Sequence, residues 1–253
     1  RFDLENPPSD EMEWHPVRLS LVSPVPSGQS GARATGRVLV PESDRAEFGV
    51  ISDIDDTVVL SKAASVLKMF WIVLLNNAHT RLPFPGVGAF YEALHRGGDG
   101  SRRNPLFYVS SSPWNIYDLL VDFMDVHGVP AGPIFLKDWS PTVLGKHEDH
   151  KLGLIRRLLA DYPDLPFVLI GDSGQEDPEI YHDAAIENPG RIQAIYIRDV
   201  TGEERRKEIT ALSKRIPDVQ MKLVKDSAAA AEHALSLDLV SRESAREVFA
   251  ASE

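Results

Sequence analysis

The chain has 253 residues, of which 43% are hydrophobic and 26% are charged, and its formal net charge at pH 7 is −11. This balance is typical of a globular protein large enough to bury a core without cross-links, and the acidic charge argues against a nucleic-acid partner, which needs a basic surface. The absence of cysteine excludes disulfides and thiolate metal sites.

Two short stretches near the start of the chain, residues 14–22 and 34–41, alternate polar and apolar residues and predict two strands. A loop rich in Pro, Gly and Ser separates them. We therefore expect residues 1–47 to form an N-terminal β segment, the end of a small β domain, and residues 48–253 to form a second domain. Because the chain begins at Arg1 rather than Met, we expect it to be a trimmed or processed product.

From residue 48 onward, predicted strands alternate with predicted helices. The predicted strands are 48–53, 105–110, 132–136, 165–172, 192–198 and 219–224, and the predicted helices are 112–128, 149–162, 201–215 and 227–237. Most of these strands are apolar on both faces, as in a covered parallel sheet. For the first helix we expect Ser112 as N-cap, Pro113 at the first helical position and Gly128 as the stop. The alternation predicts an α/β fold with a Rossmann-like, doubly wound parallel sheet.

One long segment, about residues 60–90, interrupts the alternation after the first of these strands. Its centre, residues 65–79, is expected to be helical, so we predict a small helical cap insertion over the strand ends. Residues 66–75 are apolar nearly all round and form either a buried helix or a lid that meets lipid acyl chains. No apolar run reaches the roughly 18 residues of a membrane span. We therefore expect a cytoplasmic protein, with any membrane contact at the periphery.

Polar residues gather where the predicted strands end, and in such sheets ligands bind beyond the carboxyl ends of the strands. They are Asp53, Asp55, Asp56 and Thr57 after the first strand, Ser110 at the end of the second, Lys151 before the fourth, and Asp172 and Asp177 after the fourth. Carboxylates without cysteine suit Mg²⁺. One carboxylate can attack phosphorus and a second can protonate the leaving group, while a lysine and a serine hold the phosphoryl oxygens.

Each of these residues also has a plainer interpretation. An aspartate-rich turn is often solvated, and a peripheral charge is the preferred interpretation of Asp56. Asp177 fits a helix cap before Pro178 as well as it fits a metal ligand. Lys151 could lie on the surface, with Lys137 and Lys146 as substitutes. For His147 and His150 a solvated loop is preferred over a zinc site.

Four segments together resemble a known family. They are "GVISDIDDTV" (49–58), "FYVSSSPWNIY" (107–117), "HK" (150–151) and "LIGDSGQEDPEIY" (169–181). The first and last resemble motifs of haloacid dehalogenase (HAD) superfamily phosphatases. The set as a whole resembles the catalytic domain family of the actin-patch phosphatidate phosphatases and its bacterial relatives, over residues 36–200.

The resemblance implies a role for each matching residue. Asp53 would be the nucleophile and a Mg²⁺ ligand, and Asp55 the general acid and base, with its backbone carbonyl on the metal. Asp172 and Asp177 would complete the Mg²⁺ site. Ser110 would bind the transferring phosphoryl group, and Lys151 would neutralise nucleophile and phosphate. The candidate substrate-binding residues are Thr57, Ser111, Trp114 and Asn115, although Trp114 and Asn115 equally suit a packed helix start.

These expectations combine into a Mg²⁺-dependent phosphomonoester hydrolase that works through an aspartyl-phosphate. The resemblance favours phosphatidate or a related phospholipid as substrate, giving diacylglycerol and phosphate. Two alternatives stay open. One is a phosphatase for a soluble phosphomonoester, and the other is a non-catalytic module that binds lipid or protein on a HAD fold.

Overall fold

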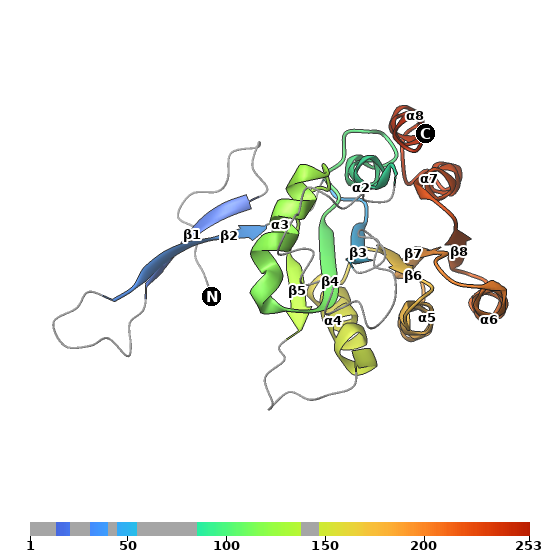
Figure 1. Cartoon of the computed structure of the whole chain (residues 1–253), viewed down its shortest axis with the longest axis horizontal. Coiled ribbons are helices and arrows are strands. Elements are labelled where there is room, and N and C mark those ends of the chain that lie inside the picture. Colours follow the sequence, from blue (N-terminus) through green and yellow to red (C-terminus); the bar gives the residue numbers. More distant parts are fainter. Residues whose placement is uncertain (1–13, 21–30, 40–44, 55–84, 138–146) are drawn as a thin grey trace. The chain divides into compact units, whose positions relative to one another are not determined.

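The structure is a computed structural model that describes residues 14–20, 31–39, 45–54, 85–137 and 147–253. The chain divides into two compact units, Arg1–Asp44 and Arg45–Glu253. Figure 1 labels their helices and strands. Several residues singled out in the sequence lie outside the described ranges: Asp55, Asp56, Thr57, Lys146 and the apolar segment 66–75.

The first unit contains an antiparallel pair of strands, β1 (Trp14–Ser20) and β2 (Arg33–Leu39). Their register runs from Trp14 opposite Leu39 to Ser20 opposite Arg33. The two strands predicted from the alternating pattern are therefore confirmed.

The second unit is built on a six-stranded sheet in which every neighbouring pair is parallel. Its order is β5-β4-β3-β6-β7-β8. The strands are β3 (Gly49–Asp53), β4 (Leu106–Pro113), β5 (Ile134–Lys137), β6 (Phe167–Asp172), β7 (Ile192–Arg198) and β8 (Gln220–Val224). This order, in which the chain runs outward from β3 to one edge and then from β6 to the other, is the Rossmann-like order. The predicted strands and fold class are confirmed.

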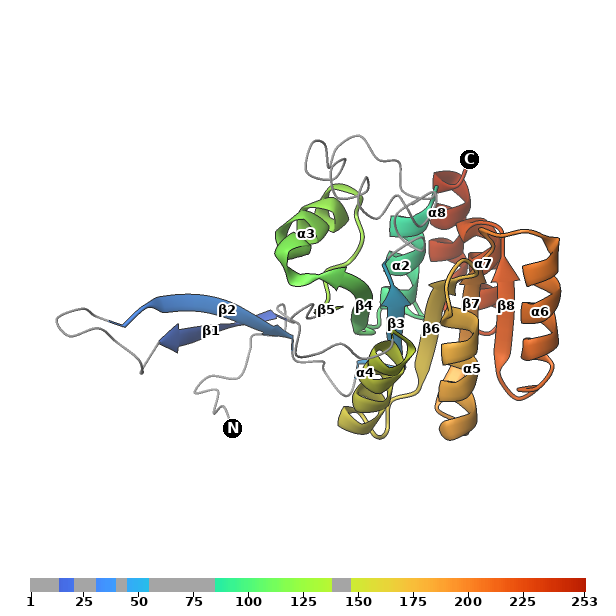
Figure 2. The ribbon, with the colours of Figure 1, turned by 60° about the horizontal axis from the view of Figure 1, so that its bottom comes forward.

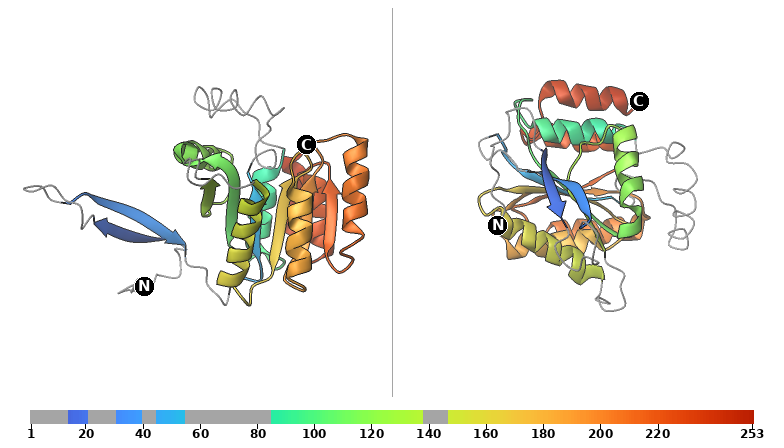
Figure 3. Two further views of the ribbon diagram at one scale, coloured as in Figure 1. Left: turned by 90° about the horizontal axis from the view of Figure 1, so that it is seen from below. Right: turned by 90° about the vertical axis from the view of Figure 1, so that its left-hand side faces the viewer.

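Helices cover both faces of the sheet and make three layers, which Figures 2 and 3 show from several directions. On one face lie α2 (Val87–Arg96), α3 (Tyr117–Val126), α7 (Ser227–Ser236) and α8 (Arg242–Ala251). On the other lie α4 (His147–Asp161), α5 (Asp177–Glu187) and α6 (Glu203–Ser213). None of the helices in the described residues is both long and apolar enough to cross a bilayer.

The central strands are buried on both faces because successive side chains enter different core clusters. In β3, Val50 packs in the cluster under α2 and α7, whereas Ile51 packs in the cluster under α4 and α5. The neighbouring β6 repeats this alternation with Val168 and Leu169. Two buried faces explain why these strands have continuous apolar sequences rather than an amphipathic alternation.

The start of α3 differs from the prediction. Ser112 and Pro113 do not open the helix, because β4 continues in the extended conformation through Pro113, which pairs with Lys137 of β5. A short 3-10 turn (Trp114–Ile116) follows, and α3 begins at Tyr117. The φ of a proline is compatible with an extended strand and with the first turn of a helix. The sequence therefore could not decide between the two, and the predicted helix start at Pro113 is wrong. At the other end, Gly128 has a φ of +63° and stops the helix as predicted.

Candidate active site

Three aspartates meet at the carboxyl end of the two central strands. Asp53 is the last residue of β3 and Asp172 the last of β6, and β3 and β6 are neighbours. Asp177 is the first residue of α5, directly before Pro178. This is the point at which the strand order reverses, where doubly wound sheets bind their ligands.

The three carboxylates form a compact, buried group. One oxygen from each of Asp53, Asp172 and Asp177 lies within 4.8 Å of the others, and all three residues are buried. Within the ranges that the structure describes, no other cluster of metal-ligating side chains is this close. A set of oxygen ligands without nitrogen or sulfur is the donor set of a hard divalent cation. The chemistry of these residues therefore fits a metal ion.

Lys151 of α4 places a cation against this group. Its Nζ donates to Oδ1 of Asp53 at 2.9 Å and also to Oδ1 of Asp177. The residue is 4% exposed, so the alternative of a surface lysine is wrong. Burial by itself lowers the pKa of Lys151, but the carboxylates of Asp177 and Asp53 outweigh it and raise that pKa above its ordinary value. Lys151 is therefore a charged partner of the nucleophile candidate.

The backbone between the two later aspartates is folded tightly around their side chains. The amide of Asp172 donates to Oδ2 of Asp177 at 3.2 Å, and the amide of Gly174 donates to Oδ1 of Asp172 at 2.6 Å. A Cβ at Gly171 would lie 2.8 Å from the Cβ of Asp177, so this position has no room for a side chain. Asp177 opens α5 but is not its N-cap, which is Glu176.

Three serines in the second half of β4 lie beside this group. Val109 of β4 is the register partner of Asp53, and Ser110 is the next residue. Ser110 and Ser112 are buried, and the amide of Ser112 donates to Oγ of Ser110 at 3.0 Å. Ser111 is partly exposed. Ser110 thus lies at the sheet edge that carries the aspartates, as predicted, although its role stays a prediction.

Two further candidates follow β4 on the surface. Trp114 is 54% exposed and its ring stacks on that of Tyr117, with centroids 5.9 Å apart and an interplanar angle of 23°. Asn115 is exposed as well. A packed helix start therefore does not describe Trp114 and Asn115. They remain candidates for substrate contact.

Two arginines near the aspartates were not identified from the sequence. Arg198 ends β7 in register with Asp172, is buried, and donates to Oγ of Ser227 at 3.4 Å. Burial lowers the pKa of Arg198 to about 10, and nearby Tyr91, Asp226 and Asp172 oppose that shift. The signal in the sequence was an arginine at the end of a largely apolar strand. Arg205 lies in the strongly charged α6. Such a sequence predicts a helix face that is exposed to solvent.

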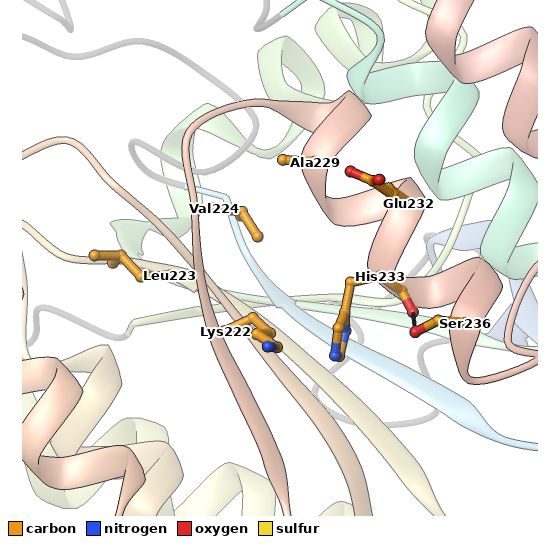
Figure 4. Close-up of a pocket in the computed structure, with 7 residues that line it drawn as sticks. All are labelled: Lys222, Leu223, Val224, Ala229, Glu232, His233 and Ser236. Atoms are coloured by element: carbon orange, nitrogen blue, oxygen red, sulfur yellow. Dashed lines mark hydrogen bonds between the residues drawn. The ribbon is translucent and has the colours of Figure 1, made fainter.

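A pocket of about 340 Å³ lies between β8 and α7. Figure 4 shows the residues that line it: Lys222, Leu223, Val224, Ala229, Glu232, His233 and Ser236. None of the site residues predicted from the sequence lines this pocket.

Comparison with known proteins places the chain in a family. Residues 48–199, more than half of the chain, match the family model described as "Phosphatidate phosphatase APP1, catalytic domain". The chain belongs to this family. The matched range contains Asp53, Ser110, Lys151, Asp172 and Asp177, so the aspartate cluster lies inside the family's catalytic domain. The resemblance inferred from the four motifs is confirmed.

Two curated relatives match part of the chain. The chain is 36% identical over 156 residues to Phosphatidate phosphatase APP1 of Saccharomyces cerevisiae, which covers 60% of this chain and 26% of that protein. It is 28% identical over 187 residues to an uncharacterized protein of Schizosaccharomyces pombe, covering 71% of this chain and 30% of that protein. The chain thus spans less than a third of the length of either relative.

Two solved structures are similar to the chain at low sequence identity. A HAD family hydrolase from Deinococcus radiodurans R1, with bound phosphate and sodium, has a TM-score of 0.47 and 15% identity and covers 77% of this chain and 98% of that one. DsGPDH of Dunaliella salina has a TM-score of 0.43 and 18% identity, and the match covers 73% of this chain and 37% of that one.

Proposed function

We propose that the chain hydrolyses phosphomonoesters through a covalent phosphate on Asp53. The observation that carries this proposal is the buried contact of Lys151 with both Asp53 and Asp177, beside Asp172. A module that merely bound a ligand would have no need to hold a carboxylate at a strand end and neutralise it with a buried lysine. The contact therefore favours an enzyme over the non-catalytic alternative.

Asp53, Asp172 and Asp177 would hold the metal ion, Mg²⁺, together with the backbone carbonyl of Asp55. When bound, Mg²⁺ would offset the negative charge of the phosphoryl group as it is transferred. Lys151 binds two of the three carboxylates, and Arg198 is the other cation close to them in the described part of the chain. The three negative charges still outnumber the two positive ones, and a divalent cation would balance the excess.

In the first step, a carboxylate oxygen of Asp53 attacks phosphorus, and a new O–P bond forms as the bond from phosphorus to the ester oxygen breaks. Asp55, two residues after Asp53, gives its proton to the departing ester oxygen, which leaves as an alcohol. Lys151 orients Asp53 for this attack, and Ser110 holds a phosphoryl oxygen. The product of the step is an aspartyl-phosphate.

In the second step, a water molecule attacks the phosphorus of the aspartyl-phosphate while Asp55 takes up a proton from that water. The bond between Asp53 and phosphorus breaks, so inorganic phosphate leaves and the Asp53 carboxylate is restored. Both carboxylates end the cycle in the protonation states in which they began it.

Phosphatidate is the substrate that we propose, with diacylglycerol as the second product and peripheral contact with a membrane. Two observations support a lipid: the relative from Saccharomyces cerevisiae has the name phosphatidate phosphatase, and the exposed Trp114 and Tyr117 follow the strand that carries Ser110. Stacked Trp and Tyr rings suit the interface between water and lipid. A soluble phosphomonoester is the alternative substrate.

The test measures phosphate release by the wild type, Asp53→Asn and Asp161→Asn. Each is assayed with Mg²⁺ or with a chelator, on phosphatidate in mixed micelles and on glycerol phosphate. Asp161 is the matched control because it is an exposed aspartate at the end of α4. We expect Mg²⁺-dependent release by wild type and Asp161→Asn and none by Asp53→Asn. Wild-type protein that releases no phosphate from either substrate, or an active Asp53→Asn, contradicts the proposal.

A further inference from the structure

The loop that joins the two later aspartates, residues 173–176, is fastened to α6 by one arginine. Nε of Arg205 donates to the carbonyl oxygen of Ser173 at 3.3 Å, and Nη2 donates to the carbonyl oxygen of Gln175 at 3.1 Å. The same guanidinium binds both carboxylate oxygens of Glu179, in the first turn of α5, at 2.6 and 2.7 Å. Arg205 therefore contacts the chain on both sides of Asp177.

Each N–H donor of this guanidinium has an acceptor. An arginine side chain has five N–H donors in one plane, and Arg205 makes five bonds, the fifth from Nη1 to Glu208 at 3.1 Å. Lysine has three donors on one atom and cannot reach two carbonyls and a carboxylate in this planar arrangement. The contact thus depends on the shape of arginine as well as on its charge.

A second attachment holds the beginning of the same loop. Oγ of Ser173 accepts from the amide of Val200 at 2.9 Å and from Oγ1 of Thr201 at 2.9 Å. Ser173 directly follows Asp172, and the residues that Arg205 binds, Gln175 and Glu179, are two positions on either side of Asp177. Both aspartates are therefore within two residues of a bond to α6 or to the segment that precedes it.

We propose that Arg205 is a positioning residue that sets the affinity of the aspartate cluster for its divalent cation. This inference rests on the metal site of the proposed function, and Arg205 acts through Asp172 and Asp177 rather than on the reacting atoms. A loop that is already ordered loses little conformational entropy when the ion binds. Without the guanidinium, ordering the loop would oppose binding, and changes to residues that orient metal ligands typically weaken affinity about 10- to 100-fold.

The test compares Arg205→Lys with Arg156→Lys. Arg156 is the matched control because it forms a two-point ion pair with Glu187 at the other end of α5, with Nε 2.7 Å from Oε2, and that pair does not involve the loop. Titration calorimetry with Mg²⁺ on the whole chain gives the dissociation constant without any turnover. The Mg²⁺ dependence of phosphate release gives a second readout.

We expect Arg205→Lys to raise the dissociation constant for Mg²⁺ about tenfold or more, with kcat restored at saturating Mg²⁺, and Arg156→Lys to bind like the wild type. Glu179→Gln, which keeps the shape but removes the charge of the partner, should weaken binding in the same direction and replaces Arg205→Lys if that variant does not fold. If the folded variants bind Mg²⁺ as tightly as the wild type, the role of Arg205 is overturned and the metal site is not. Wild-type protein that binds no Mg²⁺ overturns it together with the metal site, whereas tight binding without phosphate release counts against the proposed function alone.

Discussion

Nζ of Lys151 lies 2.9 Å from Oδ1 of Asp53, although 98 positions separate the two residues in the sequence. The contact is buried, and the same ammonium binds Asp177 of a third element. It forms because α4 runs antiparallel to the strands it connects, so that its beginning lies near the sheet edge where β3 and β6 end. Lys151 thus joins Asp53, the nucleophile candidate, to Asp177, a metal-ligand candidate.

Lys151→Met keeps the length of the side chain but removes its charge. We expect kcat for phosphate release to fall about 100-fold or more, because a charge aimed at the transition state is lost. Without Mg²⁺, we also expect the free energy of unfolding to fall by about 3–5 kcal/mol, the usual result of removing one partner of a buried ion pair. Steady-state assays and urea unfolding measure the two effects.

Arg157→Met on the same helix is the control for Lys151→Met. Arg157 pairs with Asp161 at 3.6 Å, but its side chain is 76% exposed, so we expect stability to change by no more than about 0.5 kcal/mol and activity to stay the same. A Lys151→Met enzyme with wild-type kcat would rule out the role assigned to the lysine.

Gly171→Ala tests whether the position of Asp177 matters for metal binding. The added Cβ would lie 2.8 Å from the Cβ and the Cγ of Asp177, so Asp177 has to move. We expect a loss of about 1–3 kcal/mol of stability and weaker binding of Mg²⁺, measured by unfolding and by calorimetry. Gly153→Ala is the control, since nothing lies within 4 Å of a Cβ there. It should be neutral or stabilise α4 by up to about 1 kcal/mol.

Trp114→Ala separates the two classes of substrate. Trp114 is 54% exposed, so its removal should change stability by less than about 0.5 kcal/mol. If the Trp114–Tyr117 pair contacts lipid, KM for phosphatidate in micelles rises several-fold while KM for glycerol phosphate and both kcat values stay the same. Equal effects on the two substrates would instead place Trp114 in general contact with the phosphoester.

The strands and the strand-end residues were predictable from the sequence for a shared physical reason. A strand buried on both faces has a continuous apolar run, and the side chains that follow parallel strands meet at one edge of the sheet. Asp53 and Asp172 could therefore be grouped before any geometry was known. The match to the family over residues 48–199 confirms the resemblance drawn from the four motifs.

The parts that could not be predicted depend on contacts between distant elements. Pro113 suits a strand or a helix start, and its pairing with Lys137 decided for the strand. Helix α5 buries Asp177 and His182 together with Tyr181, so its sequence lacks a clear apolar stripe. Arg205 reaches residues 26 to 32 positions away, and nothing in the local pattern of α6 indicates which charged residue does so.

A pH dependence is expected from His233 of α7, which lines the pocket in Figure 4. Burial, and then the charge of Lys222, lower the pKa of His233 below its ordinary value of 6.5. The folded state therefore favours neutral histidine, whose Nδ1 lies 3.2 Å from Oη of Tyr196. This contribution to stability is present above pH 6.5 and is lost as the pH falls through the lowered pKa.

Urea unfolding between about pH 5 and pH 8 measures this effect. The free energy of unfolding should fall more steeply below pH 6.5 in the wild type than in His233→Gln, which cannot titrate there. Lys222→Met should lie between them, because it removes one of the two causes of the shift. Parallel curves for wild type and His233→Gln would contradict the assignment.

Asn104 joins the entrance of the central strand to the end of α2. Its Oδ1 accepts from the amides of Glu47 at 2.8 Å and Phe48 at 3.2 Å, and its Nδ2 donates to the carbonyl oxygen of Leu94 at 2.8 Å. The side chain is fully buried, so Asn104→Ala leaves three backbone groups without this partner. We expect a loss of about 2–4 kcal/mol in the free energy of unfolding.

Asn188→Ala is the matched control for Asn104→Ala, because the Asn188 amide makes one bond, to the carbonyl oxygen of Ala184 at 2.9 Å, at a partly buried site. Its removal should cost about 1 kcal/mol or less. If both variants unfold at the same urea concentration as the wild type, the connection made by Asn104 does not hold β3 in place. A large loss in Asn104→Ala alone would show that the strand carrying Asp53 depends on this one side chain at its opposite end.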